Sequence, residues 1–289
     1  MSQPAPRRES VFLRRLAHWG ALRGPRDFIR LSPAPIGVAF GLALPEVRRR
    51  VVRNLRRIYG PRGALREQLD ALSTISNYAA CFTEAIASER RDTEPSVQVH
   101  GAERLQRALE RGGGVVIVTA HIGPWELTAQ LLGSSLGADV MLVMQREANE
   151  RAGQLQDMHR SERGLKVLHV GAHPTEALPL IAHLKRGGVA AMQLDRVPPS
   201  GRVLRAPLFG EPFSAPEGPF RLASLSGALV VPVFARRLDF FQYELSIEEP
   251  IELGRRASAA ELGSAAAQAV GAMEAWLKGC PTQWFHFGE

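Results

Sequence analysis

The spacing of apolar residues changes character near residue 95. Before that point apolar residues recur every three or four positions, the period of an amphipathic helix. One helix is predicted over 45–59, opening at Pro45, and a second over 66–89. We therefore expect residues 1–95 to form an N-terminal helical portion whose apolar faces pack on a core.

From residue 96 onward, short apolar runs alternate with helical patterns. Strands are predicted at 115–119, 140–144, 167–170, 189–193, 230–234 and 241–247, and helices at 102–110, 125–132, 150–163, 175–185 and 218–225. A final helix ends near Trp276, and Ser258 and Glu261 have the spacing of a capping box at its start. This alternation predicts an α/β fold for residues 96–289, with a mixed, mostly parallel central sheet flanked by helices. We expect both portions to form one continuous globular unit.

Charge is distributed unevenly along the chain. Residues 1–66 hold fifteen arginines against Glu9, Asp27 and Glu46, a net of +12, so the remainder carries −5 of the total of +7. Such asymmetry favours a polyanionic partner, either nucleic acid or an anionic membrane surface, over a merely solvated basic helix. Aromatic residues do not interleave with the basic segment, so we expect a membrane surface and no nucleic acid.

Composition narrows the class of protein further. Hydrophobic residues make up 45% and charged residues 22%, as in globular proteins. The two cysteines do not suggest a disulfide framework or a metal site, which fits a cytoplasmic protein. The apolar run 36–44 is far shorter than the ~20 residues that span a bilayer, so we expect an interfacial or buried segment. No signal peptide, metal or cofactor is predicted.

The candidate chemistry lies just after the strand predicted at 115–119. His121 follows this buried strand, Pro124 begins a helix, and Glu126 is five positions after the histidine. On a continuous helix these two side chains would diverge, but a strand-to-helix turn at Ile122 and Gly123 would let Glu126 fold back onto the imidazole. A carboxylate at one ring nitrogen would leave the other to act as a general base. The alternative is a structural histidine.

Two other glycine-containing segments resemble catalytic motifs but lie in the wrong context. Residues 133–137 match the Gly-x-Ser-x-Gly elbow of hydrolases, yet a predicted helix precedes them and a strand follows. Residues 112–114 precede a strand, the reverse of a dinucleotide-binding loop. We therefore expect neither a serine nucleophile nor a nucleotide site.

Several segments in order resemble the bacterial lipid A biosynthesis (late) acyltransferase family. The stretch from His121 to Glu126 is similar to the family's His-x4-Glu/Asp motif, with His, Gly, Trp and Glu in place. Further similar segments are Leu184-Lys185-Arg186-Gly187-Gly188 followed by Asp195-Arg196, then Pro207-Leu208-Phe209-Gly210, Pro216-Glu217-Gly218-Pro219, Gly227-Ala228, Val231-Pro232 and Pro281-Thr282-Gln283-Trp284. The resemblance covers residues 45–285.

The resemblance implies transfer of a fatty acyl chain from acyl carrier protein or acyl-CoA to a lipid hydroxyl, without a covalent acyl-enzyme. His121 would be the general base and Glu126 its acidic partner. Arg160, with Arg163 as second choice, would hold an acceptor phosphate, and Asp195 would close the cleft. Further candidates for phosphate contacts are Arg146, Arg196 and Arg221. The expected location is the cytoplasmic face of the inner membrane, peripheral or shallowly inserted.

Two departures from the family pattern leave the acceptor open. Pro124 stands where the family commonly has Asn, and Asp195-Arg196-Val197 lacks a second acid. A lysophospholipid or a glycosylated lipid is therefore an alternative to a lipid A precursor. A thioesterase or lipid hydrolase using water, and a non-catalytic lipid-binding protein, are alternatives of other classes.

Overall fold

The structure is a computed structural model that describes residues 11–88, 90, 93, 95–128, 132, 140–145, 166–170, 174–198 and 201–288, and the side chains of these except 11–15 and 145. Its N-terminal part is helical, as predicted. The helices are α1 (Val11–Arg23), α2 (Arg26–Leu31), α3 (Pro33–Ala43), α4 (Pro45–Tyr59) and α5 (Ala64–Ala87). The helix expected at 150–163 lies outside the described residues.

The remainder alternates strands with helices. Its strands are β1 (Ser96–His100), β2 (Val115–Thr119), β3 (Val140–Gln145), β4 (Lys166–Val170), β5 (Val189–Gln193), β6 (Val203–Leu208), β7 (Glu211–Pro216), β8 (Leu229–Asp239) and β9 (Gln242–Ile247). Its helices are α6 (Ala102–Glu110), η1 (Pro174–Ala177), α9 (Leu178–Lys185), α10 (Gly218–Ser226), α11 (Ala259–Gly279) and η2 (Pro281–Gln283). Ser258 and Glu261 form the predicted capping box at the start of α11.

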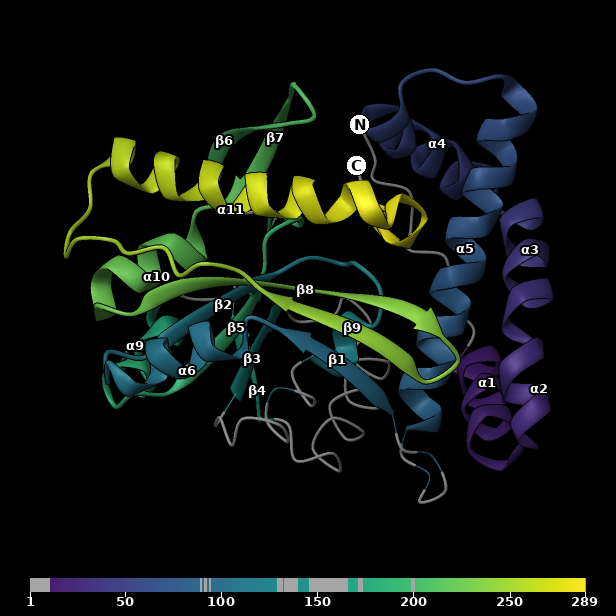
Figure 1. Cartoon of the computed structure of the whole chain (residues 1–289), viewed down its shortest axis with the longest axis horizontal. Helices are drawn as coiled ribbons and strands as arrows, with labels where there is room; N and C mark the ends of the chain where they lie inside the picture. Colours follow the sequence, from purple (N-terminus) through teal and green to yellow (C-terminus); the bar gives the residue numbers. More distant parts are fainter. Residues whose placement is uncertain are drawn as a thin grey trace.

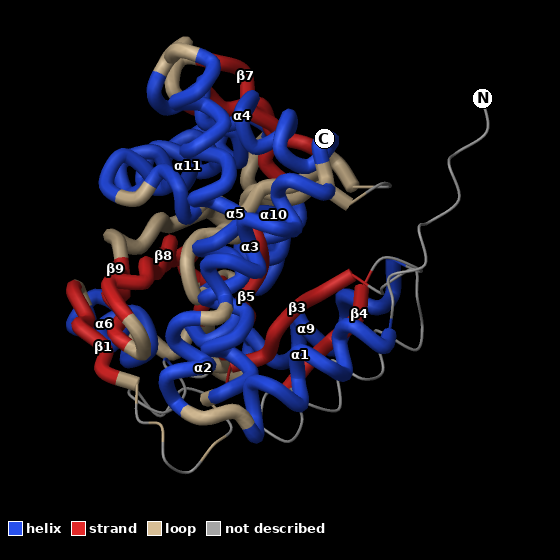
Figure 2. Tube along the Cα trace, turned by 90° about the vertical axis from the view of Figure 1, so that its right-hand side faces the viewer, coloured by secondary structure: helices blue, strands red, loops and turns tan. Residues whose placement is uncertain are grey.

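Among the described residues, seven strands form one sheet in the order β1-β9-β8-β2-β5-β3-β4. Strands β8, β2, β5, β3 and β4 are parallel to one another, while β9 is antiparallel to β8 and parallel to β1. Figure 2 shows β3 and β4 side by side at the edge of this sheet. The prediction of an α/β fold with a mixed, mostly parallel sheet is confirmed.

Helices cover both faces of the sheet. All five residues of β2 are buried, and successive side chains point to opposite faces. Val116 and Val118 join a cluster with residues of α9, α10 and α11, whereas Val115 and Ile117 pack with Leu105 of α6. Figure 1 shows α11 crossing above the sheet and α6 below it. A strand buried on both faces reads as a continuous apolar run, which is why the central strands were predicted well.

Three strands were not predicted from the sequence. The edge strand β1 alternates exposed with half-buried residues over only five positions, so it lacks an apolar run. Strands β6 and β7 form a separate antiparallel pair in which Pro207 is paired with Pro212. Proline carries no N–H for a sheet hydrogen bond and therefore weakens the sequence signal of a strand.

Helix α3 contains most of the apolar run predicted to be interfacial or buried, and it is buried on one side and exposed on the others. Gly37 and Gly41 face α5, where an added Cβ would lie 2.5 Å from Cα of Ser76 and 2.6 Å from Cδ2 of Leu72, respectively. These glycines let the two helices pack closely. Ile36, Val38, Phe40 and Leu42 are exposed on the other sides of α3.

None of the helices that the structure describes is, on its own, long and apolar enough to cross a membrane. One bent pair, Arg26–Ala43 with Pro45–Tyr59, passes the length and composition test together, with an angle of 102° between its two parts.

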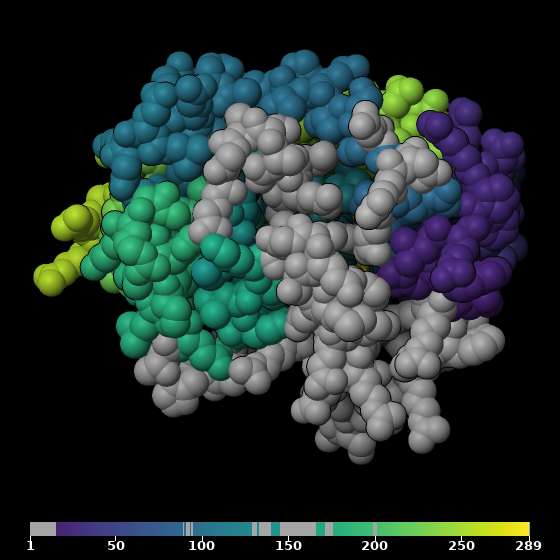
Figure 3. Space-filling view, turned by 90° about the horizontal axis from the view of Figure 1, so that it is seen from below, coloured from purple at the N-terminus to yellow at the C-terminus, as the bar shows by residue number. Residues whose placement is uncertain are grey.

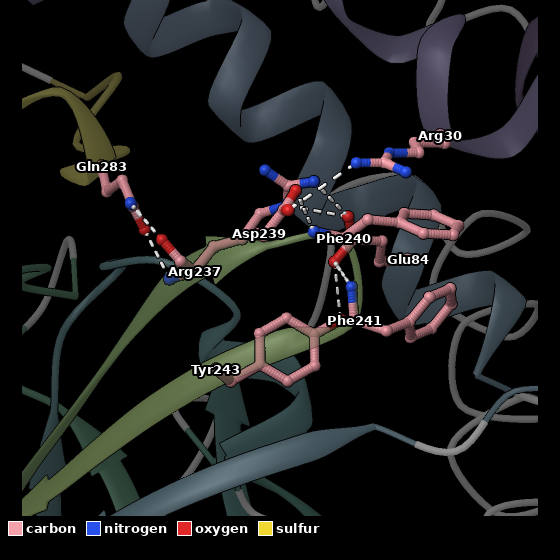
Figure 4. Close-up of polar contacts among 8 residues, drawn as sticks. All are labelled: Arg30, Glu84, Arg237, Asp239, Phe240, Phe241, Tyr243 and Gln283. Atoms are coloured by element: carbon pink, nitrogen blue, oxygen red, sulfur yellow. Dashed lines mark hydrogen bonds and ion pairs between the residues drawn. The ribbon is translucent and has the colours of Figure 1, made fainter. Parts of the chain in front are cut away.

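A buried carboxylate connects α5 to the β8–β9 hairpin. Glu84 of α5 accepts hydrogen bonds from Arg237 Nε at 2.7 Å and from the Tyr243 hydroxyl at 2.6 Å, as Figure 4 shows. Phe241 donates its backbone N–H to the same carboxylate at 3.3 Å. Burial raises the pKa of Glu84, and Arg237 counteracts that effect. The Glu84 carboxylate, with three hydrogen bonds, therefore joins the helical portion to the β8–β9 hairpin of the sheet.

Candidate active site

The central feature of the site is the pairing of β2 with β5. These strands are parallel neighbours whose register ends at Thr119 opposite Gln193, and Leu194 N–H continues the ladder to the Thr119 carbonyl at 2.7 Å. Two positions beyond that last register pair lie His121 on one strand end and Asp195 on the other. Because side chains alternate between faces, equivalent positions on neighbouring strands lie on the same side of the sheet. The register thus brings the imidazole and the carboxylate together.

The contact between these two side chains is direct. Nδ1 of His121 lies 2.8 Å from Oδ1 of Asp195, and the backbone N–H of His121 donates to Oδ2 at 3.0 Å. The Asp195 side chain is completely buried and that of His121 is 7% exposed. A carboxylate at Nδ1 favours the tautomer with the proton on Nδ1, which leaves Nε2 as the proton acceptor.

Electrostatics keep the Asp195 carboxylate ionised despite its burial. Burial by itself raises the pKa of Asp195. The nearby His121 charge, the hydrogen bonds from His121 and the more distant His286 act in the opposite direction and hold the pKa of Asp195 well below its usual range. A permanently charged, buried carboxylate is suited to stabilise an imidazolium that forms beside it.

The turn after His121 is sharp, as the sequence predicted. Gly123 has φ +54°, and an added Cβ would lie 2.6 Å from the Ala235 carbonyl oxygen of β8. Trp125 N–H donates to the Gly123 carbonyl at 2.9 Å, and Leu127 N–H to the Pro124 carbonyl at 2.8 Å. The Trp125 and His121 rings are in edge-to-face contact, with their centroids 4.9 Å apart. Glycine is needed here because it combines a positive φ with close backbone packing.

The C-terminal segment completes the surroundings of Asp195. The indole Nε1 of Trp284 donates to Oδ2 of Asp195 at 3.1 Å. Nδ1 of His286 lies 3.9 Å from the same oxygen, and the Trp284 and His286 rings stack. Burial, the largest cause, lowers the pKa of His286. Sequence reasoning noted Trp284 only as part of a family-like segment and assigned His286 no role.

Asp195 lies at the end of the strand next to β2 and makes the direct contact with the imidazole. Sequence analysis assigned the orienting carboxylate to Glu126 and made Asp195 a residue that closes the cleft. In the structure the carboxylate at Nδ1 of His121 belongs to Asp195. Glu126 lies on the helical turn 125–128 with a half-buried side chain, and its catalytic role stays a prediction. The signal available in the sequence was that His121 and Asp195 each follow the end of a predicted strand by two positions.

The predicted arginines fall into three groups. Arg196 directly follows Asp195 in the sequence, and its side chain is exposed. Arg221 lies on α10 and pairs with Glu217 one turn earlier at 2.6 Å, so its guanidinium already has a carboxylate partner. Arg146, Arg160 and Arg163 lie outside the described residues. Within the described ranges, no group of three or more His, Cys, Asp or Glu residues is placed to hold a metal ion.

No curated protein sequence matches this chain. Among solved structures, the 1-acyl-sn-glycerophosphate (LPA) acyltransferase PlsC from Thermotoga maritima is similar at 16% identity, covering 85% of this chain and 97% of that one, with a TM-score of 0.41. The family described as bacterial lipid A biosynthesis acyltransferase matches residues 4–289. Because this match spans nearly the entire sequence, the chain belongs to the bacterial lipid A biosynthesis acyltransferase family.

Proposed function

We propose that this protein transfers a fatty acyl chain from an acyl thioester, acyl carrier protein or acyl-CoA, to a hydroxyl of a lipid A precursor or a related phospholipid or glycolipid. The observation that carries the proposal is the buried His121–Asp195 pair at adjoining strand ends in a member of an acyltransferase family. Such a pair can take a proton from an alcohol at neutral pH. The family supplies the acyl transfer, and the pair supplies the base.

The reaction proceeds by direct attack. Nε2 of His121 accepts the proton of the acceptor hydroxyl as its oxygen attacks the thioester carbonyl. The tetrahedral intermediate collapses, the carbon–sulfur bond breaks, and the imidazolium returns the proton to the leaving thiolate. Asp195 stabilises the transient positive charge of the imidazole. No covalent acyl-enzyme forms in this scheme, and no metal or cofactor takes part.

Charged residues near the His121–Asp195 pair have two proposed roles: arginines bind the acceptor lipid, and Glu126 acts on the imidazolium. Arg196 would contact a phosphate or other anionic group of the acceptor, because it follows Asp195 directly and is exposed. The family resemblance adds Arg160 and Arg163 to this role, since arginine binds phosphate through paired N–H groups. Glu126, at the acidic position of the family motif, would add negative charge on the other side of the turn.

We further propose that the protein works at an anionic membrane surface through its N-terminal helices. Most of the exposed large apolar side chains in the described residues lie on α1–α5, including Trp19, Phe28 and Phe40. Arginines of the same segment would contact acidic headgroups, each gaining roughly 1 kcal/mol near the surface. In Figure 3 the first of these helices, coloured purple, lie at one end of the molecule. The expected location is the cytoplasmic face of the inner membrane.

The test of function begins with lipid mass spectrometry of cells with and without the protein, which identifies the lipid that gains a chain. The purified protein is then assayed with labelled acyl carrier protein and acyl-CoA donors. The expected result is labelled product lipid that depends on the acceptor, and its nearly complete loss in His121→Ala with an unchanged melting temperature. Free fatty acid as the product would indicate a thioesterase instead. Binding without turnover would indicate a lipid-binding protein, and full activity of His121→Ala would refute the general base.

A further inference from the structure

Residues 281–287, which begin just after Cys280, the C-cap of α11, form a segment that we call the C-terminal strap. It runs antiparallel to the turn after β2, with a bridge between Ile122 and Trp284. Gly123 N–H donates to the Gln283 carbonyl at 2.9 Å, and Phe285 N–H donates to the His121 carbonyl at 2.7 Å. The strap is therefore hydrogen-bonded to the backbone of His121 itself and to that of Gly123, on either side of Ile122.

Trp284 is the point at which the strap reaches the carboxylate. Its side chain is buried, and its indole N–H is directed at Oδ2 of Asp195. The same oxygen accepts the backbone N–H of His121, so two donors hold Oδ2 while Oδ1 is left for Nδ1 of His121. A carboxylate restrained at one oxygen by two N–H groups cannot rotate without losing both. Its orientation toward the imidazole is thereby fixed.

Gln283 anchors the strap to the sheet next to this contact. Its side-chain oxygen accepts the backbone N–H of Arg237 at 2.8 Å, and its side-chain nitrogen donates to the Arg237 carbonyl at 2.8 Å. Figure 4 shows this two-point contact beside the Glu84–Arg237 ion pair. Gln283 thus binds the strap to β8 as an additional strand would. At its far end, Asn54 of α4 donates to the His286 carbonyl at 2.6 Å, and Figures 1 and 2 both place the C-terminus near α4.

We propose that Trp284 is a positioning residue of the acyl-transfer site, and that its indole N–H holds Asp195 in the orientation that presents Oδ1 to His121. The inference rests on the proposed function, because it acts through the general base. It adds a chemical consequence. A carboxylate held toward Nδ1 stabilises the imidazolium that forms during the transfer, so loss of the indole N–H weakens that stabilisation.

Several other charged or titratable groups surround His121 and must be considered. Asp195 comes from the end of β5, and His286 comes from the strap. Arg196 and Arg57 of α4 act on His286 through their charges. Glu126 follows on the helical turn 125–128. A substitution that changes only the indole N–H leaves all of these in place.

The test replaces Trp284 by phenylalanine, which keeps a buried aromatic ring but lacks the N–H. We expect kcat to fall by about tenfold, the cost of one hydrogen bond to a charged group, with KM changing less than twofold. The acid limb of the kcat/KM profile should move to lower pH, because an Asp195 that is free to turn away from Nδ1 stabilises the imidazolium less. A merely structural role would lower stability without moving this limb.

Trp276→Phe is the matched control. This indole, on α11, donates to the Ala235 carbonyl at 3.5 Å instead of to Asp195. The same change of side chain there should leave kcat and the pH profile unaltered. If Trp284→Phe melts too low for assay, Gln283→Leu tests the strap instead, since it removes the contact with β8 and keeps the indole. Gln283→Leu should lower kcat, as Trp284→Phe does.

NMR of the hydrogen bond itself separates this inference from the proposed function. The Nδ1–H signal of His121, assigned from its loss in His121→Asn, reports the contact with Asp195. This signal should move upfield in Trp284→Phe relative to the wild-type protein, whatever the activity. An unchanged signal, together with unchanged kcat, would overturn the role of Trp284. An inactive wild-type protein in which the signal still moves would leave the strap intact and refute only the acyl transfer.

Discussion

His121 and Asp195 lie 74 residues apart in the sequence, yet they occupy equivalent positions two residues beyond the paired ends of β2 and β5, with Nδ1 2.8 Å from Oδ1. Parallel strands end at one edge of their sheet, and function in open α/β sheets collects there. The site therefore depends on the order and register of the strands. The histidine follows β2 and its carboxylate follows β5, two strands that are neighbours in the sheet but not in the sequence.

The first prediction concerns the identity of the orienting carboxylate. Asp195→Asn should lower kcat by roughly 10²- to 10⁴-fold, because an amide cannot stabilise the imidazolium and favours no single tautomer. Glu126→Gln should have a smaller effect. Steady-state kinetics of both variants measure the difference, with Asp239→Asn, on the exposed Arg30–Asp239 ion pair, as the control. A larger loss in Glu126→Gln than in Asp195→Asn would return the orienting role to Glu126.

The second prediction concerns the turn that carries the histidine. Gly123→Ala should destabilise the fold by about 1–3 kcal/mol, since φ is +54° and the new methyl group would meet backbone atoms of β8. Denaturant unfolding measures the change. Gly271→Ala in α11 is the control, because no atom lies within 4 Å of its added Cβ, and it should be neutral or stabilising. Equal stability of both variants would contradict the strained turn.

The third prediction is the pH dependence of stability. His286 has a lowered pKa in the fold, so the unfolded chain binds more protons below pH 6.5 and stability falls as the pH decreases from that value. Asp195 and Glu67, whose pKa values are also lowered, that of Glu67 to about 2, extend the loss to more acidic pH. The raised pKa of Glu84 opposes this trend below neutrality.

Chemical unfolding at pH 7, 6 and 5 tests the histidine contribution. The free energy of unfolding should decrease between pH 7 and pH 5 in the wild-type protein, and less steeply in His286→Gln. The same slope in both proteins would exclude His286 as the source.

The fourth prediction concerns the membrane surface. Trp19→Glu and Phe40→Glu should weaken binding to vesicles of phosphatidylcholine and phosphatidylglycerol at 3:1, because exposed apolar residues of α1 and α3 would no longer enter the interface. Leu178→Glu on α9 is the control, since Leu178 is similarly exposed but α9 lies on the opposite side of the molecule from α1 and α3 in Figure 1. Cosedimentation measures binding. An equal loss for all three would point to a non-specific charge effect.

The sequence by itself determined the local features of this protein. The ends of β2 at Thr119 and β5 at Gln193, the bounds of α4 and α6, the turn at Gly123 and the cap at Ser258 all follow from periodicity and from the conformational preferences of neighbouring residues. Apolar runs buried on both faces give a strong local signal. Family membership was also readable, because several short segments recur in order.

Only the tertiary structure decided which side chains meet. Glu126 was expected as the partner of His121 because it is the acid of the His-x4-Glu motif, and that role stays a prediction. Asp195 contacts His121 from 74 residues further along the chain, and Trp284 contacts Asp195 from a further 89 residues. Periodicity places a residue at the end of a strand but does not specify the neighbouring strand. That choice is made by packing of whole helices and strands against one another, a long-range property that no local pattern contains.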